Sequence, residues 1–318
     1  MKKLLLVALI AVFAITLFAV NYPTKSISLV CPWGAGGGTD RLARFMADEL
    51  SKELGQPVVV VNKTGGGGAV GHGAGAYAKN DGYTVTLVTL EIATMHWLGL
   101  TPLTYENLDY IAQVNQDPAG LIVKADNEWY SAADMLVDVA LNQGEYLFSG
   151  SGAGTIWDLS RIGMFNSVGI APDAVTWVPT AGAAPSIVEL LGGHIDAITC
   201  SIPEAYPQIA SGDLKALAIM ADERDPRFAN VPTLKEMGID WASGTWRGFA
   251  VPNGTSAEIK KILEDAVLKI AASDAFLDFM DKNGFGIKIR NSVEFTSFVE
   301  DQDSVWKEVL KIGGYLAE

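Results

Sequence analysis

The stretch that most constrains this chain is residues 26–55, SISLVCPWGAGGGTDRLARFMADELSKELG. Ile27, Leu29 and Cys31 occupy every second position, which predicts a short, mostly buried strand. A glycine-rich turn follows, and then comes a predicted helix. Its apolar face consists of Leu42, Phe45, Met46 and Leu50. We expect Thr39 or Asp40 to supply the oxygen atom that caps the start of this helix.

This strand–turn–helix unit predicts an anion-binding site. The first N–H groups of a helix lack partners, the helix dipole is positive there, and glycine lets a ligand approach the backbone. A phosphate-binding loop would end in Gly-Lys-Ser/Thr, but in this chain the glycines are followed by Thr39 and Asp40. A dinucleotide-binding fold would have an acidic residue at the end of its second strand, but this strand ends in Asn62. Nucleotide binding is therefore disfavoured. A tight turn without a ligand is the alternative, but four glycines beside Trp33 exceed what a turn needs.

A second glycine-rich loop, residues 62–73, follows a predicted strand at 58–61 that is apolar on both faces, as in a parallel sheet. The carboxyl ends of neighbouring parallel strands open on the same edge, where ligands bind. Two glycine loops at adjacent strand ends therefore predict one shared site. Among the histidines we expect His72, His96 and His194 to be structural or superficial, because no Cys/His cluster has metal-ligand spacing.

The second half of the chain repeats this design. A strand at 146–148 leads through a Ser/Gly loop at 149–155 into a helix, and a strand at 175–178 leads through a loop at 179–183 into another helix. The chain crosses between the halves near residues 117–123 and 247–252. This layout predicts a two-lobed α/β clamp that closes on an anion.

Two further segments complete the expected architecture. Residues 107–114 and 120–123 are predicted as strands separated by Asp117-Pro118, where the chain leaves the first lobe. The last 60 or so residues are predicted to hold two amphipathic helices, at 258–272 and 293–312.

Residues 1–20 are predicted to be a targeting segment. Lys2 and Lys3 precede an apolar run, and Leu17-Phe18-Ala19 is a plausible cleavage site. A retained membrane anchor is the alternative, because the run approaches spanning length. A soluble domain begins almost at once, so we expect export to a bacterial periplasm.

The net charge of the chain limits its binding partners, and its two cysteines allow at most one disulfide. The net charge of −14 becomes −16 once Lys2 and Lys3 are removed, which disfavours nucleic acid and anionic lipid as partners. Cys31 and Cys200 each lie in an apolar strand-like run, so we expect two buried thiols rather than a disulfide.

Five segments in order resemble the substrate-binding proteins of tripartite tricarboxylate transporters, the Bug family. They are residues 22–50 (YPTKSISLVCPWGAGGGTDRLARFMADEL), 58–84 (VVVVNKTGGGGAVGHGAGAYAKNDGYT), 148–165 (FSGSGAGTIWDLSRIGMF), 178–199 (VPTAGAAPSIVELLGGHIDAIT) and 246–259 (WRGFAVPNGTSAEI). Each motif alone is moderately specific, but the resemblance covers essentially the whole mature chain.

The resemblance implies a type II periplasmic binding-protein fold, with two Rossmann-like lobes joined by crossover strands. Residues 21–118 and 248–318 would form lobe 1, and 119–247 would form lobe 2. It also implies a small carboxylate ligand, such as a di- or tricarboxylate or another organic acid, delivered to membrane transporter subunits. We expect a monomer with no cofactor, no metal and no catalytic residues.

The resemblance further implies which residues hold the ligand, largely through backbone amides, hydroxyls and bridging waters. The first-lobe residues are Trp33, Gly34, Ala35, Gly36, Gly37, Gly38, Thr39, Gly66, Gly67, Gly68 and Ala69. The second-lobe residues are Ser149, Ser151, Thr155 and Thr180. Asp40 is expected to cap and orient the first helix, and Asp196 to be structural.

Two departures from the family pattern leave the ligand open. Trp157 stands where the family usually has a histidine, and Thr180-Ala181 stands where it often has an aromatic and a polar residue. Arg161 and Arg247 are the nearest candidate cations, and both could form salt bridges instead.

Two other functions share the same chain features. An exported α/β enzyme acting on a small anion would need a nucleophile or base, for which Glu91 and His96 are the best candidates. Glu91 could equally select the ligand or cap a helix. A sensor that reports the ligand to a membrane kinase would use the same binding chemistry.

Overall fold

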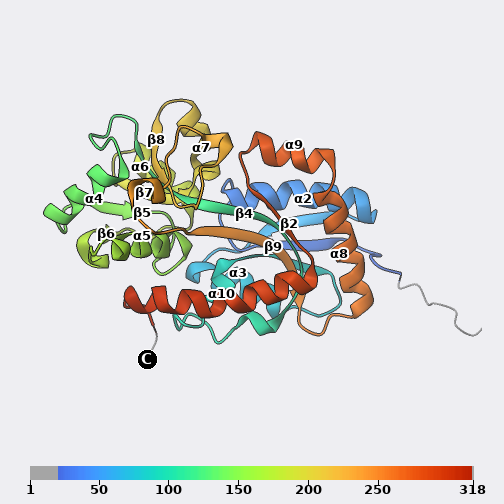
Figure 1. Ribbon diagram of the computed structural model, residues 1–318. Coiled ribbons are helices and arrows are strands. Elements are labelled where there is room, and N and C mark those ends of the chain that lie inside the picture. Colours follow the sequence, from blue (N-terminus) through green and yellow to red (C-terminus); the bar gives the residue numbers. More distant parts are fainter. Residues whose placement is uncertain (1–20, 317–318) are drawn as a thin grey trace, which may run out of the picture.

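The computed structural model describes residues 21–316, so the predicted targeting segment 1–20 lies outside the described residues. Helices and strands alternate along the chain (Figure 1). The strands are β1 (Ile27–Cys31), β2 (Val58–Asn62), β3 (Thr84–Thr89), β4 (Leu108–Lys124), β5 (Leu147–Ser149), β6 (Thr176–Trp177), β7 (Ala197–Ser201), β8 (Leu214–Ile219), β9 (Gly244–Pro252) and β10 (Ile287–Arg290). The helices are α2 (Gly38–Leu54), α3 (Ala69–Ala76), α4 (Ala132–Leu141), α5 (Ile156–Ser167), α6 (Ala183–Leu191), α7 (Ile202–Ala210), α8 (Ala257–Ala271), α9 (Asp274–Lys282) and α10 (Ser292–Ile312).

The strands form two groups that share β4, which gives the molecule two lobes. In the first group β1 pairs in parallel with β2 and β3, and β3 and β4 both pair antiparallel with β9. In the second group β5 pairs in parallel with β6 and β7, and β4 pairs antiparallel with β7 and β8. Figure 1 shows β4 and β9 running between the two groups. The carboxyl ends of β1, β3, β5 and β7 are therefore the places where ligand loops can meet.

Strand β4 corrects one sequence prediction. Two strands broken at Asp117-Pro118 were expected, but one strand continues from 108 to 124. Pro118 is the last partner of β9, and Ala119 is the first partner of β7. Proline has no N–H to donate, and it is tolerated here because the strand changes partners at this point.

Two local predictions were also wrong. Helix α2 begins at Gly38 with Gly37 as its N-cap, because the Thr39 hydroxyl accepts from Arg247 and the Asp40 carboxylate accepts from Gly36 and Arg44. Residues 258–312 contain three helices rather than two, since Ser273 caps the additional helix α9. Strand β2 pairs in parallel with β1, as predicted, and at this edge of the sheet Val59 is half exposed.

The molecule has two apolar cores, and the second one spans both strand groups. The first core combines residues from both ends of the chain, including Leu29, Leu42, Met46, Phe249, Leu263, Phe276 and Phe285. The second includes Leu121, Phe148, Phe165 and Ile198, and it extends to Phe295 and Trp306 of α10. Cys31 and Cys200 are buried free thiols, which confirms the prediction.

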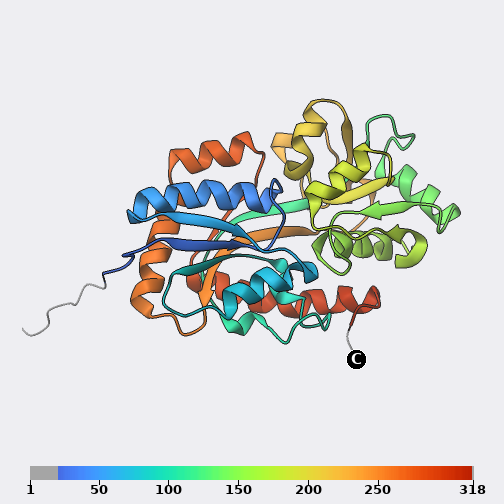
Figure 2. The same cartoon turned by 180° about the vertical axis from the view of Figure 1, so that it is seen from behind.

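Helix α10 lies along one side of the molecule and reaches both strand groups (Figures 1 and 2). Just beyond its end, the Tyr315 hydroxyl donates to Asp158 Oδ2 of α5 at 2.7 Å. Within residues 21–316, none of the helices combines the length and apolar character that a bilayer crossing requires.

Candidate ligand-binding site

The glycine-rich turn after β1 is held in one conformation by side chains on three elements. Asp40 Oδ2 accepts from the Gly36 N–H at 2.9 Å, and Asn62 donates to the Trp33 carbonyl at 2.9 Å. The Trp33 indole N–H donates to Thr89 Oγ1 at 3.1 Å. Gly36 has a φ of +85°, which favours glycine. Asp40 thus orders the turn, although it does not cap the helix.

The second glycine-rich loop supports this turn from behind. The His72 ring is fully buried, with Nδ1 2.9 Å from the Gly68 carbonyl and Nε2 accepting from the Thr89 N–H at 3.2 Å. Burial lowers the pKa of His72 from 6.5 to about 4, so the ring is neutral at physiological pH. His72 is therefore a structural residue, as predicted.

Loops from both strand groups enclose one cavity. Its lining residues are Trp33, Gly34, Gly37, Gly38, Thr39, Glu91, Ser151, Ile156, Trp157, Ala181, Gly182, Ala183, Ala184, Pro185, Glu204, Thr245 and Arg247. The volume is about 30 Å³, room for about two water molecules, so a larger ligand requires the loops to move apart.

The structure brings six of the predicted ligand residues to this cavity: Trp33, Gly34, Gly37, Gly38, Thr39 and Ser151. The other predicted residues, Ala35, Gly36, Gly66, Gly67, Gly68, Ala69, Ser149, Thr155 and Thr180, are not among its lining residues. Several of these support the lining. Ser149 Oγ donates to the Val178 carbonyl at 2.6 Å, and Thr155 Oγ1 hydrogen-bonds Ser151 Oγ.

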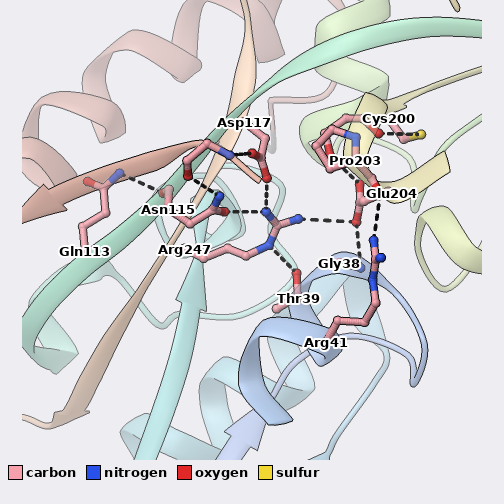
Figure 3. A network of polar contacts seen from close by, with 12 residues as sticks. Gly38, Thr39, Arg41, Gln113, Asn115, Asp117, Cys200, Pro203, Glu204 and Arg247 are labelled. Atoms are coloured by element: carbon pink, nitrogen blue, oxygen red, sulfur yellow. Dashed lines mark hydrogen bonds and ion pairs between the residues drawn. The ribbon is translucent and has the colours of Figure 1, made fainter. Parts of the chain in front are cut away.

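Arg247 of β9 is the centre of a buried polar network (Figure 3). Its Nη1 lies 2.6 Å from Asp117 Oδ2 and 2.5 Å from Asn115 Oδ1, both on β4. Its Nε donates to Thr39 Oγ1 of α2 at 2.9 Å. Its Nη2 lies 3.4 Å from Glu204 Oε1 of α7. A single guanidinium therefore connects both strand groups at the base of the cavity.

Glu204 occupies the helix start that the sequence assigned to a ligand. Its Oε1 accepts from the Gly38 N–H at 3.3 Å, although α7 belongs to the other strand group (Figure 3). Burial raises the pKa of the Glu204 carboxyl, and Arg247 opposes that rise. The chain thus supplies its own carboxylate to the N-terminus of α2.

Glu91 makes a similar contact from the first strand group to a helix start of the second. It follows β3, and its Oε1 accepts from the Ile156 N–H at the start of α5 at 3.2 Å. Its Oε2 accepts from Thr89 Oγ1 at 2.5 Å. Burial raises the pKa of the Glu91 carboxyl, which hydrogen bonds to Thr89 and Ile156 partly offset.

Two residues considered in the sequence lie elsewhere. Arg161 pairs with Asp158 at 2.6 Å and donates to the Pro172 carbonyl at 2.5 Å, so it stabilises α5 rather than lining the cavity. His96 lies 3.1 Å from Asp303 of α10.

Sequence reasoning identified Glu91 and Arg247 as candidates but missed Glu204. One local signal was available: Ser201 precedes Glu204 by three residues at a strand–helix junction, which is capping-box spacing. Ser201 Oγ does lie 3.3 Å from Glu204 Oε2. That spacing predicts the start of a helix, but it does not predict that the Glu204 carboxylate reaches the other lobe.

Comparisons with known proteins identify relatives of this chain. Residues 42–314 match the model of the tripartite tricarboxylate transporter family receptor. Protein BugT of Bordetella pertussis is 29% identical over 324 residues, covering 97% of both chains.

Solved structures agree over most of the chain. A TctC solute-binding protein from Polaromonas is 37% identical with a TM-score of 0.68, covering 91% of this chain and 99% of that one. MatC from Rhodopseudomonas palustris, with bound malate, is 26% identical with a TM-score of 0.84, covering 91% and 100%. Rpa4515 of R. palustris, with adipate, is 26% identical with a TM-score of 0.85, covering 92% and 99%.

Proposed function

This chain belongs to the tripartite tricarboxylate transporter receptor family, and on that premise we propose that it binds a small carboxylate in the cavity around Arg247 and delivers it to a membrane transporter. The observation that supports this proposal is the convergence of α2, α5 and α6 on one cavity. Each helix contributes residues of its N-terminal end: Gly38, Ile156 and Ala183. In this structure the N–H groups of Gly38 and Ile156 donate to Glu204 and Glu91, whereas the start of α6 has no side-chain cap. Helix N-termini favour anions.

The ligand class follows from relatives of the same fold. Two of them are solved with malate and with adipate, which are both small carboxylates. In this chain the two groups of loops would move apart to admit such a ligand, and contacts from both sides would then stabilise the form that closes around it.

We also propose the wider setting. The lobes comprise 21–118 with 248–318, and 119–247, because β4 exchanges β9 for β7 and β8 at residues 118–119. The mature protein acts as a periplasmic monomer after removal of residues 1–20, which is the setting of a receptor that serves a membrane transporter.

Thermal unfolding against mono-, di- and tricarboxylates, amino acids and sugar phosphates tests the proposal. A carboxylate at 100 times its Kd adds about 2.7 kcal/mol to the free energy of unfolding, a rise of several degrees in Tm. The ligand should be recovered chemically unchanged. Shifts confined to phosphate esters, or turnover of the ligand, would overturn the proposal.

A cavity-filling variant locates the binding. A Cβ at Gly34 would meet no atom closer than the Ala181 carbonyl oxygen at 3.9 Å, so Gly34→Leu folds while its side chain fills the cavity. We expect it to abolish the ligand-induced rise in Tm. Gly73→Leu is the matched control, because Gly73 lies on α3 outside the cavity and its Cβ would meet only Tyr77 at 3.8 Å. A shift retained in Gly34→Leu would place the ligand elsewhere.

A further inference from the structure

We infer that the ligand carries a cationic nitrogen as well as a carboxylate, and that Glu91 receives this nitrogen. The inference rests on the proposed function and narrows its ligand class from carboxylates in general to aminocarboxylates.

The lining has more acidic groups than basic ones. Glu91 and Glu204 contribute two carboxylates, and Arg247 contributes one guanidinium. Arg247 is already paired, at 2.6 Å with Asp117 behind the cavity and at 3.4 Å with Glu204. The nearby Arg41 donates to the Pro203 carbonyl at 2.8 Å (Figure 3). It also donates to Asn283 at 3.1 Å. A ligand with two or three carboxylates would add negative charge where the described cations are committed.

Side chains of the protein occupy some of the helix N-termini around the cavity but not others. The start of α2 receives Glu204, and the start of α5 receives Glu91. Helix α6 has no acidic residue in its first turn and no side-chain cap. Its first residues Ala183 and Ala184 line the cavity, as do Gly34 and Gly37. One carboxylate of the ligand therefore has backbone donors available at α6, whereas a second one would compete with a glutamate of the chain.

Glu91 is suited to receive the nitrogen. An ionised carboxylate has about four lone-pair positions. Two of them serve Thr89 and Ile156, which leaves positions for an ammonium with its three N–H donors. None of the ion pairs within residues 21–316 involves Glu91. The more distant Arg247 opposes the rise in the pKa of its carboxyl that burial causes, and a ligand ammonium would supply the close positive charge that this carboxyl lacks. The indoles of Trp33 and Trp157 line the same cavity, and aromatic faces also attract cations.

Calorimetric titration of the mature protein with matched ligand series tests this inference. Each series keeps the carbon chain and changes one end: β-alanine, malonate and propionate; γ-aminobutyrate, succinate and butyrate; ε-aminocaproate, adipate and caproate. Alanine and glutamate place the ammonium beside the carboxylate instead. We expect an aminocarboxylate to bind at least about tenfold more tightly than the diacid and the monoacid of its series.

The variant Glu91→Gln tests the contribution of the Glu91 charge to ligand binding. Glutamine still offers an oxygen to the Ile156 N–H but carries no charge. We expect it to weaken aminocarboxylate binding by about tenfold or more and to leave diacid binding equal or stronger. Glu106→Gln is the matched control, because Glu106 is exposed and lies outside the cavity. Unchanged Tm values establish that both variants fold.

The outcomes separate this inference from the proposed function. If diacids bind more tightly than their amino counterparts, or if Glu91→Gln leaves aminocarboxylate affinity unchanged, this inference is wrong while the carboxylate receptor stands. If no carboxylate of any series binds, both are wrong.

Discussion

At the scale of single residues, buried polar side chains fix both the shape of the cavity and its response to pH. His72 is the clearest case, because its neutral ring joins the Gly68 carbonyl to the Thr89 N–H. Thr89 in turn holds Trp33 and Glu91 through its hydroxyl. A single buried imidazole thus positions an aromatic wall and an acidic wall of the same cavity.

His72 should make stability depend on pH. The unfolded chain binds a proton at His72 below pH 6.5, but the folded chain does so only near pH 4. Stability is therefore complete above pH 6.5 and falls, on the order of 3 kcal/mol, as pH drops to about 4. We expect urea unfolding of the protein and of His72→Gln to show a stability difference that shrinks over this range.

Taking the stability difference between the unmodified protein and His72→Gln removes the contributions of the other titratable groups. The raised pKa values of Glu91 and Glu204 act in the opposite direction, stabilising the folded state as pH falls, and both proteins share them. A stability difference that stays constant from pH 7 to about 4 would contradict the role given to His72.

Residue identity alone could predict part of this site. The glycine turn after β1 follows from local spacing, and so does its proximity to a helix start. The meeting of Arg247 with Thr39, Asp117 and Glu204 could not be predicted, because these residues lie on four elements that only the tertiary fold brings together. The same contact explains the wrong helix cap, since Arg247 takes the Thr39 hydroxyl that the sequence assigned to capping.

At the scale of elements, glycines decide how closely α3 approaches the end of β1. A Cβ at Gly71 would lie 2.4 Å from Pro32 Cα and 2.7 Å from the Lys63 carbonyl oxygen. These are backbone atoms, which cannot move without shifting the turn that carries Trp33. A Cβ at Gly73, two residues further along the helix, would meet only Tyr77 at 3.8 Å.

Alanine substitutions on α3 should therefore have opposite effects. Gly71→Ala forces overpacking and should lower the free energy of unfolding by about 1–3 kcal/mol. It should also weaken ligand binding, because Pro32 precedes the cavity residue Trp33. Gly73→Ala should raise stability by about 0.5–1 kcal/mol, since alanine favours helix without a clash. Denaturant unfolding measures both; equal effects would refute the close approach of α3.

Element boundaries show what local patterns can and cannot predict. The glycine-bounded helices were predicted because glycine ends helices for local reasons. Strand β4 was predicted as two pieces because Pro118 breaks most strands, and only the change of partner there explains its continuity. The two-lobed α/β fold could still be predicted, because it depends on the repeated strand–loop–helix order rather than on each boundary.

At the scale of the whole molecule, two glutamates hold the lobes together. Glu204 reaches from α7 to Gly38 of α2, and Glu91 reaches from the end of β3 to Ile156 of α5. Each carboxylate stands where an anionic ligand could bind a helix start. The structure therefore has internal contacts between its two strand groups that resemble ligand contacts.

Removing one of these contacts should open the ligand-free protein. Glu204→Ala removes charge-assisted contacts with Gly38 and Arg247, each of a kind that contributes about 1.5–3 kcal/mol. We expect a larger radius of gyration by X-ray solution scattering without ligand, and closure again when ligand is added. Glu145→Ala, at an exposed position of the same strand group, should scatter like the unmodified protein. Identical scattering of Glu204→Ala would mean that other contacts hold the lobes closed.

The first apolar core also sets the order in which a newly made chain can fold. Leu29, Leu42 and Met46 pack against Phe249, Leu263 and Phe276, which are synthesised some two hundred residues later. The elements from β5 to β8 are contiguous in sequence and can pack as soon as they emerge. The amino-terminal strands are synthesised first, but their core is completed last. A chain that ends before β9 would therefore leave their apolar faces uncovered and prone to aggregation.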